Sequence, residues 1–318
     1  MDAPVKNRDV AVTGGTLRVI SFGTGDRPAL AVHGITANAM CWQAVARALP
    51  ADWTLHAVDL RGRGHSRTLP GPFGFDAHSA DLRQAVSALG LERPVLIGHS
   101  LGAYIALLAA DASPGAFGPL VLVDGGPPLL IPVGTDLDAL LATSLGPAIQ
   151  RLAESYPTAE AYVDFWRAHP ALTRWNSDVE DYVRYDLTGE PGMLRSRANP
   201  AAVRADSKQL LTAADRISAA LRRLAATTPL LRAPAGMFGQ PPGLLPDEVV
   251  AYWQSEIPEL RVITIPDTNH YSILFSPDAT AVIAAQMCAA DKCKVRRQST
   301  PPAGRPSAAA HSPRAGLV

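Results

Sequence analysis

The chain has 318 residues, of which 47% are hydrophobic, and it carries 29 lysine and arginine residues against 29 aspartate and glutamate residues. A chain of this length and composition can bury a large core, as one domain with an insertion or as two closely associated units. Its balanced charge gives it no electrostatic reason to bind nucleic acid or an anionic membrane. The polar N-terminus has no apolar secretion segment and no run of about 18 apolar residues exists, so we expect a cytoplasmic protein.

Apolar runs alternate with helical patterns along the chain, which is typical of a mostly parallel sheet covered by helices on both faces. The predicted strands are Leu17–Phe22, Ala29–Val32, Leu55–Val58, Val95–Ile97, Leu120–Val123, Pro229–Leu231 and Val262–Ile265. Two of these strands lead directly into motifs. His33-Gly34-Ile35-Thr36 follows the second strand, and Asp59-Leu60-Arg61-Gly62-Arg63-Gly64-His65-Ser66 follows the third.

The fourth predicted strand leads into the pentapeptide Gly98-His99-Ser100-Leu101-Gly102, and a helix-forming stretch comes next. A strand, a serine between glycines and a helix together form the G-x-S-x-G nucleophile elbow. The glycines matter because the serine occupies a sharp turn in which a flanking Cβ would crowd the neighbouring backbone. The turn places Ser100 at a helix N-terminus, where free amides and the helix dipole favour a developing negative charge.

Residues 127–226, between the fifth and sixth predicted strands, differ from the rest because they lack convincing strands. The predicted helices there are Asp136–Ala142, Pro147–Ser155, Ala159–Ala168, Asp178–Tyr185 and Asp206–Ala226. The segment also holds a large share of the aromatic residues, namely Tyr156, Tyr162, Phe165, Trp166, Trp175, Tyr182 and Tyr185. We expect most of them to pack within the segment and one or two to line a substrate pocket. The candidates for the pocket are Trp166 and Trp175, together with Tyr271 beside His270.

The three motifs in this order make the chain resemble the α/β-hydrolase superfamily over roughly residues 7–290. The resemblance implies an α/β-hydrolase core formed by residues 1–126 and 227–290, with residues 127–226 as a helical cap over the active site. From Asp291 onward, basic residues lie among proline, serine, alanine and glycine, so residues 291–318 are predicted to be a disordered basic tail. This tail contains no nucleic-acid-binding signature.

A serine nucleophile needs a base, and the base needs an acid that orients it. His270 follows the last strand, where the superfamily carries its base. The acid usually follows the strand after the cap, but Gly239 occupies that place. Some members carry the acid after the strand that follows the elbow helix, and Asp124 stands there. We therefore predict Asp124 as the acid, with Asp247 and then Asp267 as alternatives.

The resemblance also implies an oxyanion hole formed by the backbone amides of Ile35 and Leu101. Serine at the elbow favours acyl transfer to water, so we predict hydrolysis of a small, apolar carboxylic ester or lactone through an acyl-enzyme on Ser100, with no cofactor. Amide or carbon–carbon bond hydrolysis by the same groups remains an alternative. So does a ligand-binding protein whose triad has decayed, given Gly239. The sequence leaves the oligomeric state open.

Three cysteines, Cys41, Cys288 and Cys293, cannot pair completely and do not have the spacing to histidines that zinc sites show. We therefore expect buried or incidental thiols and no metal site.

Overall fold

The computed structural model describes residues 4–131, 134–136, 139 and 151–299, and an eight-stranded sheet forms its centre. The strand order is β1-β2-β4-β3-β5-β6-β9-β10. β2 is antiparallel to β1 and to β4, and the other neighbouring pairs are parallel. The strands are β1 (Val5–Val12), β2 (Gly15–Phe22), β3 (Arg27–Val32), β4 (Trp53–Val58), β5 (Val95–His99), β6 (Leu120–Val123), β9 (Leu230–Arg232) and β10 (Val262–Thr264).

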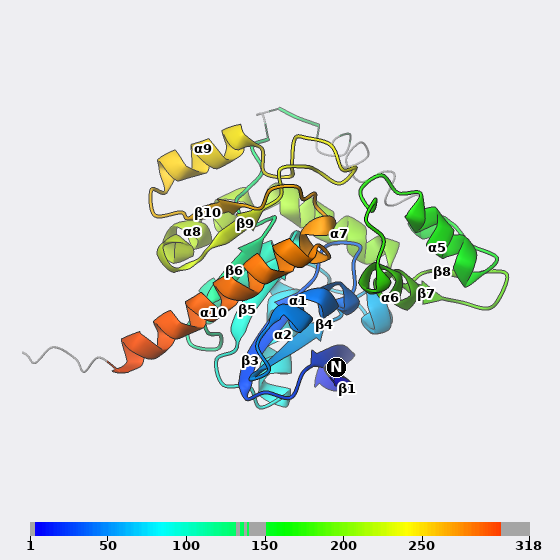
Figure 1. The fold of residues 1–318 in the computed structure, drawn as a ribbon, viewed down its shortest axis with the longest axis horizontal. Helices are drawn as coiled ribbons and strands as arrows, with labels where there is room; N and C mark the ends of the chain where they lie inside the picture. Colours follow the sequence, from blue (N-terminus) through cyan, green and yellow to red (C-terminus); the bar gives the residue numbers. More distant parts are fainter. Residues whose placement is uncertain (1–3, 132–133, 137–138, 140–150, 300–318) are drawn as a thin grey trace, which may run out of the picture.

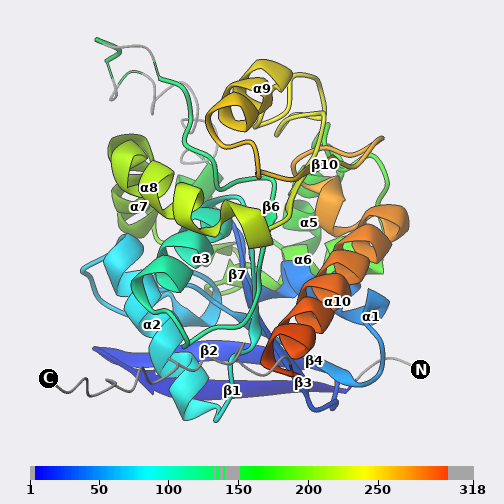
Figure 2. The same cartoon turned by 90° about the vertical axis from the view of Figure 1, so that its left-hand side faces the viewer.

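Helices cover both faces of the sheet (Figures 1 and 2). One face carries α2 (Phe75–Ala88), α3 (Leu101–Ala112) and α8 (Ala214–Leu224), and the other carries α1 (Gln43–Ala48) and α10 (Pro277–Ser299). Each face has its own apolar core because successive strand residues point to opposite sides. In β3, Leu30 and Val32 join one core and Ala29 and Ala31 join the other.

The segment between β6 and β9 is mainly helical. It contains α5 (Ala159–Arg167), α6 (Ser177–Tyr185), α7 (Pro200–Thr212), α8 and the short helix η3 (Ala225–Thr227). In Figure 1, α5 and α6 lie side by side at one end of the molecule, whereas α9 (Asp247–Glu256) lies toward the opposite end. The remaining short helices are η1 (Ala39–Trp42), η2 (Gly64–Ser66) and η4 (Ser272–Leu274).

Several sequence-based predictions need correction. The prediction that residues 127–226 lack strands is wrong, because β7 (Leu187–Thr188) and β8 (Arg195–Ser196) form a two-stranded sheet. The single helix predicted over residues 206–226 is instead two helices, α7 and α8, which meet at Ala213. The helices predicted at residues 136–142 and 147–155 lie largely outside the described residues.

The two ends of the described chain also differ from expectation. β1 was not predicted because its first five residues are exposed and mostly polar, which hides the strand alternation. α10 continues to Ser299, so the prediction of disorder is wrong for residues 291–299, where no proline or glycine interrupts the helix. Asp291 forms an ion pair with Arg27 at 2.7 Å and holds this part of the helix to the core. None of the helices within the described residues has the length and apolar character needed to cross a membrane.

Candidate active site

The turn between β5 and α3 holds Ser100 in a strained conformation, with φ of 55° and ψ of −126°. This left-handed backbone is costly for a residue with a side chain and persists only where its surroundings enforce it. A Cβ on Gly98 would lie 2.1 Å from the carbonyl oxygen of Gly102, and a Cβ on Gly102 would lie 2.1 Å from that of Val32. Both glycines are therefore required by close backbone packing, as the sequence predicts.

Ser100, His270 and Asp124 form one hydrogen-bonded chain. His270 Nε2 lies 3.0 Å from Ser100 Oγ, and His270 Nδ1 lies 2.7 Å from Asp124 Oδ2. A carboxylate only accepts hydrogen bonds, so Nδ1 carries the proton and Nε2 is free to accept from the serine hydroxyl. All three side chains are buried, and Asp124 is inaccessible to solvent.

Asp124 directly follows β6 and is held from the neighbouring strand. Its Oδ1 accepts a hydrogen bond from the amide of Ala233 at 3.0 Å, just after β9. Its own amide donates to the carbonyl of Leu231 at 2.7 Å. The segment after β9 thus supports the carboxylate through its backbone, although Gly239 leaves that segment without an acid at the usual place.

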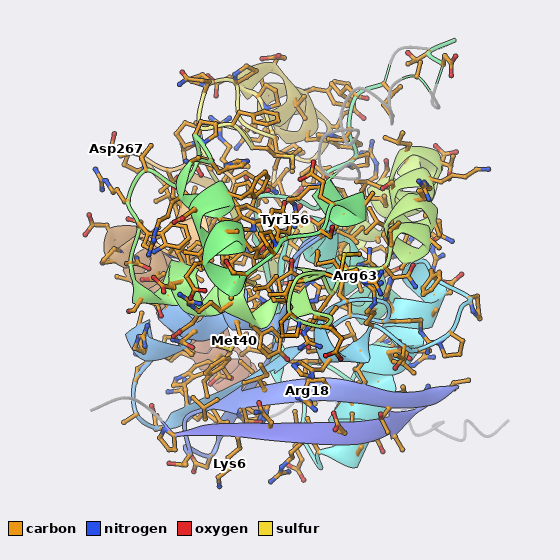
Figure 3. All side chains as sticks on the ribbon, turned by 90° about the vertical axis from the view of Figure 1, so that its right-hand side faces the viewer. Lys6, Arg18, Met40, Arg63, Tyr156 and Asp267 are labelled. Atoms are coloured by element: carbon orange, nitrogen blue, oxygen red, sulfur yellow. The ribbon has the colours of Figure 1, made fainter. Side chains whose placement is uncertain are left out.

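The two alternative acids lie elsewhere. Asp247 begins α9, is exposed and pairs with Arg232. Asp267 is exposed at the edge of the molecule (Figure 3), although only two residues separate it from His270. Neither carboxylate bonds to His270 within the described part of the chain.

Leu101 begins α3 directly after Ser100, and Ile35, in the loop after β3, lines the same cavity as Ser100. The backbone amide of neither residue donates a hydrogen bond to another described residue, so both amides remain available to a ligand. Gly34 permits this approach, because a Cβ there would lie 3.1 Å from the Cβ of Ser100. His33 orients the peptide between Gly34 and Ile35, because its Nδ1 donates to the carbonyl of Gly34 at 2.7 Å.

His33 and His99 are both held neutral by burial. Burial lowers the pKa of His33 to about 3, which suits a ring whose Nε2 accepts from the amide of Leu60 at 3.0 Å. Burial also lowers the pKa of His99 well below its ordinary value. His99 Nε2 donates to the carbonyl of His270 at 3.0 Å, which holds the His270 backbone in place. These histidines stiffen the loops around Ser100, in line with the sequence-based interpretation.

A metal ion has one candidate location within the described residues. His99, Asp124 and His270 each bring a ligand atom to within 4.8 Å of the others. Asp124 Oδ2 accepts from His270 Nδ1, and His99 Nε2 donates to the His270 carbonyl, whereas His99 Nδ1 has no hydrogen-bond partner among the described residues. Because Asp124 and His270 already bond to each other and His270 also bonds to Ser100, we describe the group as a hydrogen-bond network.

A cavity of about 90 Å³ opens onto Ser100 and His270. Its described lining is mostly apolar and contains no lysine, arginine, aspartate or glutamate. The lining residues are Gly34, Ile35, Thr36, Ala37, Cys41, His99, Ser100, Leu101, Tyr104, Leu129, Tyr182, Leu210, Met237, Leu244, His270, Tyr271, Leu274 and Phe275. Tyr182 was among the aromatic residues noted in the sequence, but residues such as Leu210, Met237 and Leu244 carry no signal there, because only tertiary packing brings them to the pocket.

The three predicted substrate-binding residues occupy different places. Tyr271 lines the cavity. Trp166 does not line it but packs behind it, with its ring 5.9 Å from that of Tyr271 and 6.4 Å from that of Tyr182. Trp175 is also absent from the lining, and its indole donates to Glu180 at 3.2 Å. Neither tryptophan therefore lines the cavity, and Trp166 packs between Tyr182 of its own segment and Tyr271 beside His270.

Three comparisons with known proteins agree on the type of fold. Residues 29–283 match the model of the alpha/beta hydrolase family. The solved structure of E-2-(acetamidomethylene)succinate hydrolase superposes with a TM-score of 0.74 at 22% identity, covering 90% of this chain and 100% of that one. At this identity the superposition is informative about the fold alone.

Two curated relatives are similar in sequence. Pimeloyl-[acyl-carrier protein] methyl ester esterase of Pectobacterium atrosepticum is 27% identical over 260 residues, which are 81% of this chain and 92% of that protein. N-formylmaleamate deformylase of Pseudomonas putida is 35% identical over 125 residues, which are 39% of this chain but only 47% of the deformylase. The chain thus spans about half the length of the latter relative.

Proposed function

The chain belongs to the alpha/beta hydrolase family, and from this premise we propose that it is a serine hydrolase that cleaves a carboxylic ester or lactone with a small, apolar acyl part. The observation that carries the proposal is the chain of hydrogen bonds from Ser100 through His270 to Asp124, beside two unoccupied backbone amides. A nucleophile, a base with a defined tautomer and donors for an oxyanion are the parts that acyl transfer needs.

In the proposed reaction, Ser100 Oγ attacks the carbonyl carbon of the substrate while His270 Nε2 takes the hydroxyl proton. The carbonyl oxygen becomes an oxyanion and accepts hydrogen bonds from the amides of Ile35 and Leu101. His270 then donates its proton to the leaving alcohol, which departs and leaves an acyl group on Ser100. Water next attacks the acyl carbon as His270 takes a water proton, and the acid leaves when that proton returns to Ser100. Asp124 stabilises the charged imidazole at both stages.

The lining of the cavity supports an uncharged acyl part. A buried carboxylate or ammonium on the substrate would need a partner of opposite charge, because desolvation of an unpaired charge is costly. The described lining offers none, whereas Ile35, Leu210 and Leu274 offer apolar contact. A relative matched over 92% of its own length is named as a methyl ester esterase, which supports an ester, whereas the 35% identical relative is named as a deformylase, which keeps amide hydrolysis as the alternative.

The segment 127–226 is proposed as a cap that completes the pocket. It contributes Leu129, Tyr182 and Leu210 to the lining, whereas Ser100 and His270 come from the two sheet-forming parts of the chain. Buried polar contacts join this segment to the core. Asn38 donates to the carbonyl of Tyr182 at 3.2 Å, for example. We propose that the cap selects the substrate and that the core performs the chemistry.

Covalent labelling with a fluorophosphonate tests the proposal. We expect rapid, stoichiometric labelling of the wild-type chain that maps to Ser100, loss of labelling in Ser100→Ala, and no change in Ser255→Ala, whose exposed hydroxyl lies outside the cavity. The active chain is then offered p-nitrophenyl esters, lactones, anilides and β-diketones. A wild-type chain that is not labelled would defeat the proposal and favour a ligand-binding protein. If anilides are turned over faster than esters, the bond that the enzyme cleaves is an amide. If β-diketones are turned over faster, it is a carbon–carbon bond.

A further inference from the structure

Two arginines two positions apart on the loop after β4 form buried ion pairs with different partners. Arg61 pairs with Asp81 of α2, which covers the sheet, at 2.7 Å. Arg63 pairs with Asp206 of α7, in the proposed cap, at 2.5 Å. Arg63 and Asp206 are inaccessible to solvent, and Arg63 lies well inside the outline of the molecule (Figure 3). One pair therefore stays within the core, and the other joins the core to the cap.

Stability alone is a poor reason for the pair of Arg63 and Asp206. Taking two charges out of water costs more free energy than their attraction returns unless every remaining polar atom is also paired. Arg63 Nη2 and Asp206 Oδ1 have no hydrogen-bond partner among the described residues. The neighbouring His78 donates from Nε2 to Asp206 Oδ2 at 3.0 Å, but its Nδ1 also lacks a described partner. Such incomplete pairing points to a role in geometry.

The remaining contacts of Arg63 identify that geometry. Its Nε donates to the carbonyl of Ile35 at 2.9 Å, and its Nη1 donates to the carbonyl of Arg61 at 3.0 Å. The amide of Ile35 is the proposed oxyanion donor. His33 fixes the carbonyl that precedes this amide, and Arg63 fixes the carbonyl that follows it. Ile35 is thus oriented from both sides. On one side the contact comes from the guanidinium of Arg63, whose positive charge pairs with Asp206 of the proposed cap.

We propose that Arg63 is a positioning residue that couples the docking of α7 to the orientation of the Ile35 amide in the oxyanion hole. The inference rests on the proposed function, because it concerns the same site. α7 also carries Leu210, one helical turn beyond Asp206, into the lining of the cavity. A single ion pair therefore sets both the substrate wall formed by α7 and the donor that the reaction uses.

The test exchanges each charged pair for a neutral one. In Arg63→Met/Asp206→Asn, methionine replaces the aliphatic length of arginine and asparagine still accepts from His78, so we expect the fold to persist. The matched control is Arg61→Met/Asp81→Asn, which removes a buried pair from the same loop without a side-chain contact to Ile35. Each variant is measured by urea unfolding, by kcat and KM on an ester, and by hydrogen–deuterium exchange of the peptide that contains Ile35.

We expect the Arg63 double variant to lose about 10- to 100-fold in kcat, since loss of a whole oxyanion donor costs about 10²- to 10³-fold, and to raise KM by a smaller factor, about threefold, because α7 also carries Leu210. Exchange at the Ile35 peptide should become faster, and both effects should be absent from the Arg61 control. If the Arg63 double variant does not fold, Arg63→Lys keeps a positive charge opposite Asp206 but removes the Nε donor to the Ile35 carbonyl, and it should show the same direction with a smaller loss. The coupling is wrong if kcat and exchange stay at wild-type values, or if the Arg61 control changes equally. Exchange does not depend on turnover, so it tests the coupling even if the proposed hydrolase activity fails.

Discussion

The reacting centre and the proposed cap are both buried, but they are held in different ways. The centre depends on backbone: glycines in close contact, strained φ at Ser100 and Asp124, and amides such as that of Ala233. The cap reaches the cavity through side chains such as Tyr182 and Leu210. Under the proposed function, the backbone of the core fixes the reacting groups, and the side chains of the proposed cap select the substrate. Four predictions test this division, from the largest expected effect to the smallest.

Asp124→Asn should lower kcat by about 10³- to 10⁴-fold with little change in stability. The asparagine amide would donate to His270 Nδ1, so Nε2 would carry the proton and could not accept one from Ser100. Steady-state kinetics on an ester measures the effect. Asp247→Asn and Asp267→Asn serve as controls and should keep wild-type kcat, because both carboxylates are exposed and away from His270. If kcat fell strongly in Asp247→Asn or Asp267→Asn while Asp124→Asn stayed active, the residue changed in that control would be the acid that orients His270.

Gly102→Ala should destabilise the fold by about 3 kcal/mol or more, because its Cβ would lie 2.1 Å from the carbonyl oxygen of Val32 and 2.6 Å from that of His33. Gly115→Ala is the matched control. Its Cβ would meet no atom within 4 Å, although its φ of +97° leaves a backbone cost of about 1 kcal/mol. Urea unfolding measures both variants. If both variants lost the same free energy of unfolding, the close backbone contact at Gly102 would not be what stabilises the turn at Ser100.

The third prediction concerns Asp59, at the junction between core and cap. Its carboxylate accepts from the amides of Ala39 and His65 and from the hydroxyl of Tyr185 in α6, while burial raises its pKa to about 6. Between pH 4 and 6 the folded chain then holds this proton more tightly than the unfolded chain does. Its contribution to stability is therefore present at low pH and falls by about 2 kcal/mol as the pH rises through this range.

Asp59→Asn removes this titration. The free energy of unfolding of the variant should therefore lack the fall of about 2 kcal/mol between pH 4 and 6 that Asp59 causes in the wild type. Tyr185→Phe removes a donor to the carboxylate, so the pKa of Asp59 should rise and the fall in stability should move to higher pH. Urea unfolding at half-unit steps measures all three chains. Parallel curves for Asp59→Asn and wild type would contradict the raised pKa.

The smallest effect is expected for Leu210→Ala, which shortens one cap side chain in the cavity. We expect kcat/KM on a short acyl ester to fall about fivefold, corresponding to about 1 kcal/mol, while longer acyl groups gain relative to short ones. Leu224→Ala, at the end of α8 and outside this cavity, controls for general loss of apolar packing. An unchanged preference between short and long acyl chains would mean that the cap does not select the substrate.

The sequence predicts seven of the eight strands of the central sheet, all except the edge strand β1, because each of the seven is a compact apolar run with a turn or helix after it. The resemblance to the superfamily implies Ser100, His270 and Asp124 as the reacting residues, and in the structure they lie together because parallel strands end at one edge of the sheet. Gly239 is the informative exception, because a missing acid directs attention to the neighbouring strand, where Asp124 stands.

The cap could be predicted only in outline. Its aromatic residues share helical spacing whether they face the pocket or the segment's own core, so Trp166, which packs behind the pocket wall, and Tyr182, which lines the cavity, look alike in sequence. The break between α7 and α8 at Ala213 carries no proline or glycine to mark it. In the sequence Arg63 is one residue of the motif that follows the third predicted strand. Its burial, its ion pair with Asp206 143 residues later and its hydrogen bond to Ile35 are visible only in the structure.

The location of Asp124 directly after β6 has a consequence for redesign. The stretch from Ala233 to Leu245 supports the carboxylate with one main-chain amide, which any residue except proline can provide. The same stretch sends Met237 and Leu244 into the cavity. The side chains at positions 237 and 244 can therefore be exchanged to shift acyl preference, while every ionisable member of the triad stays on another part of the scaffold and the pairing of Ala235 with the loop before His270 is kept.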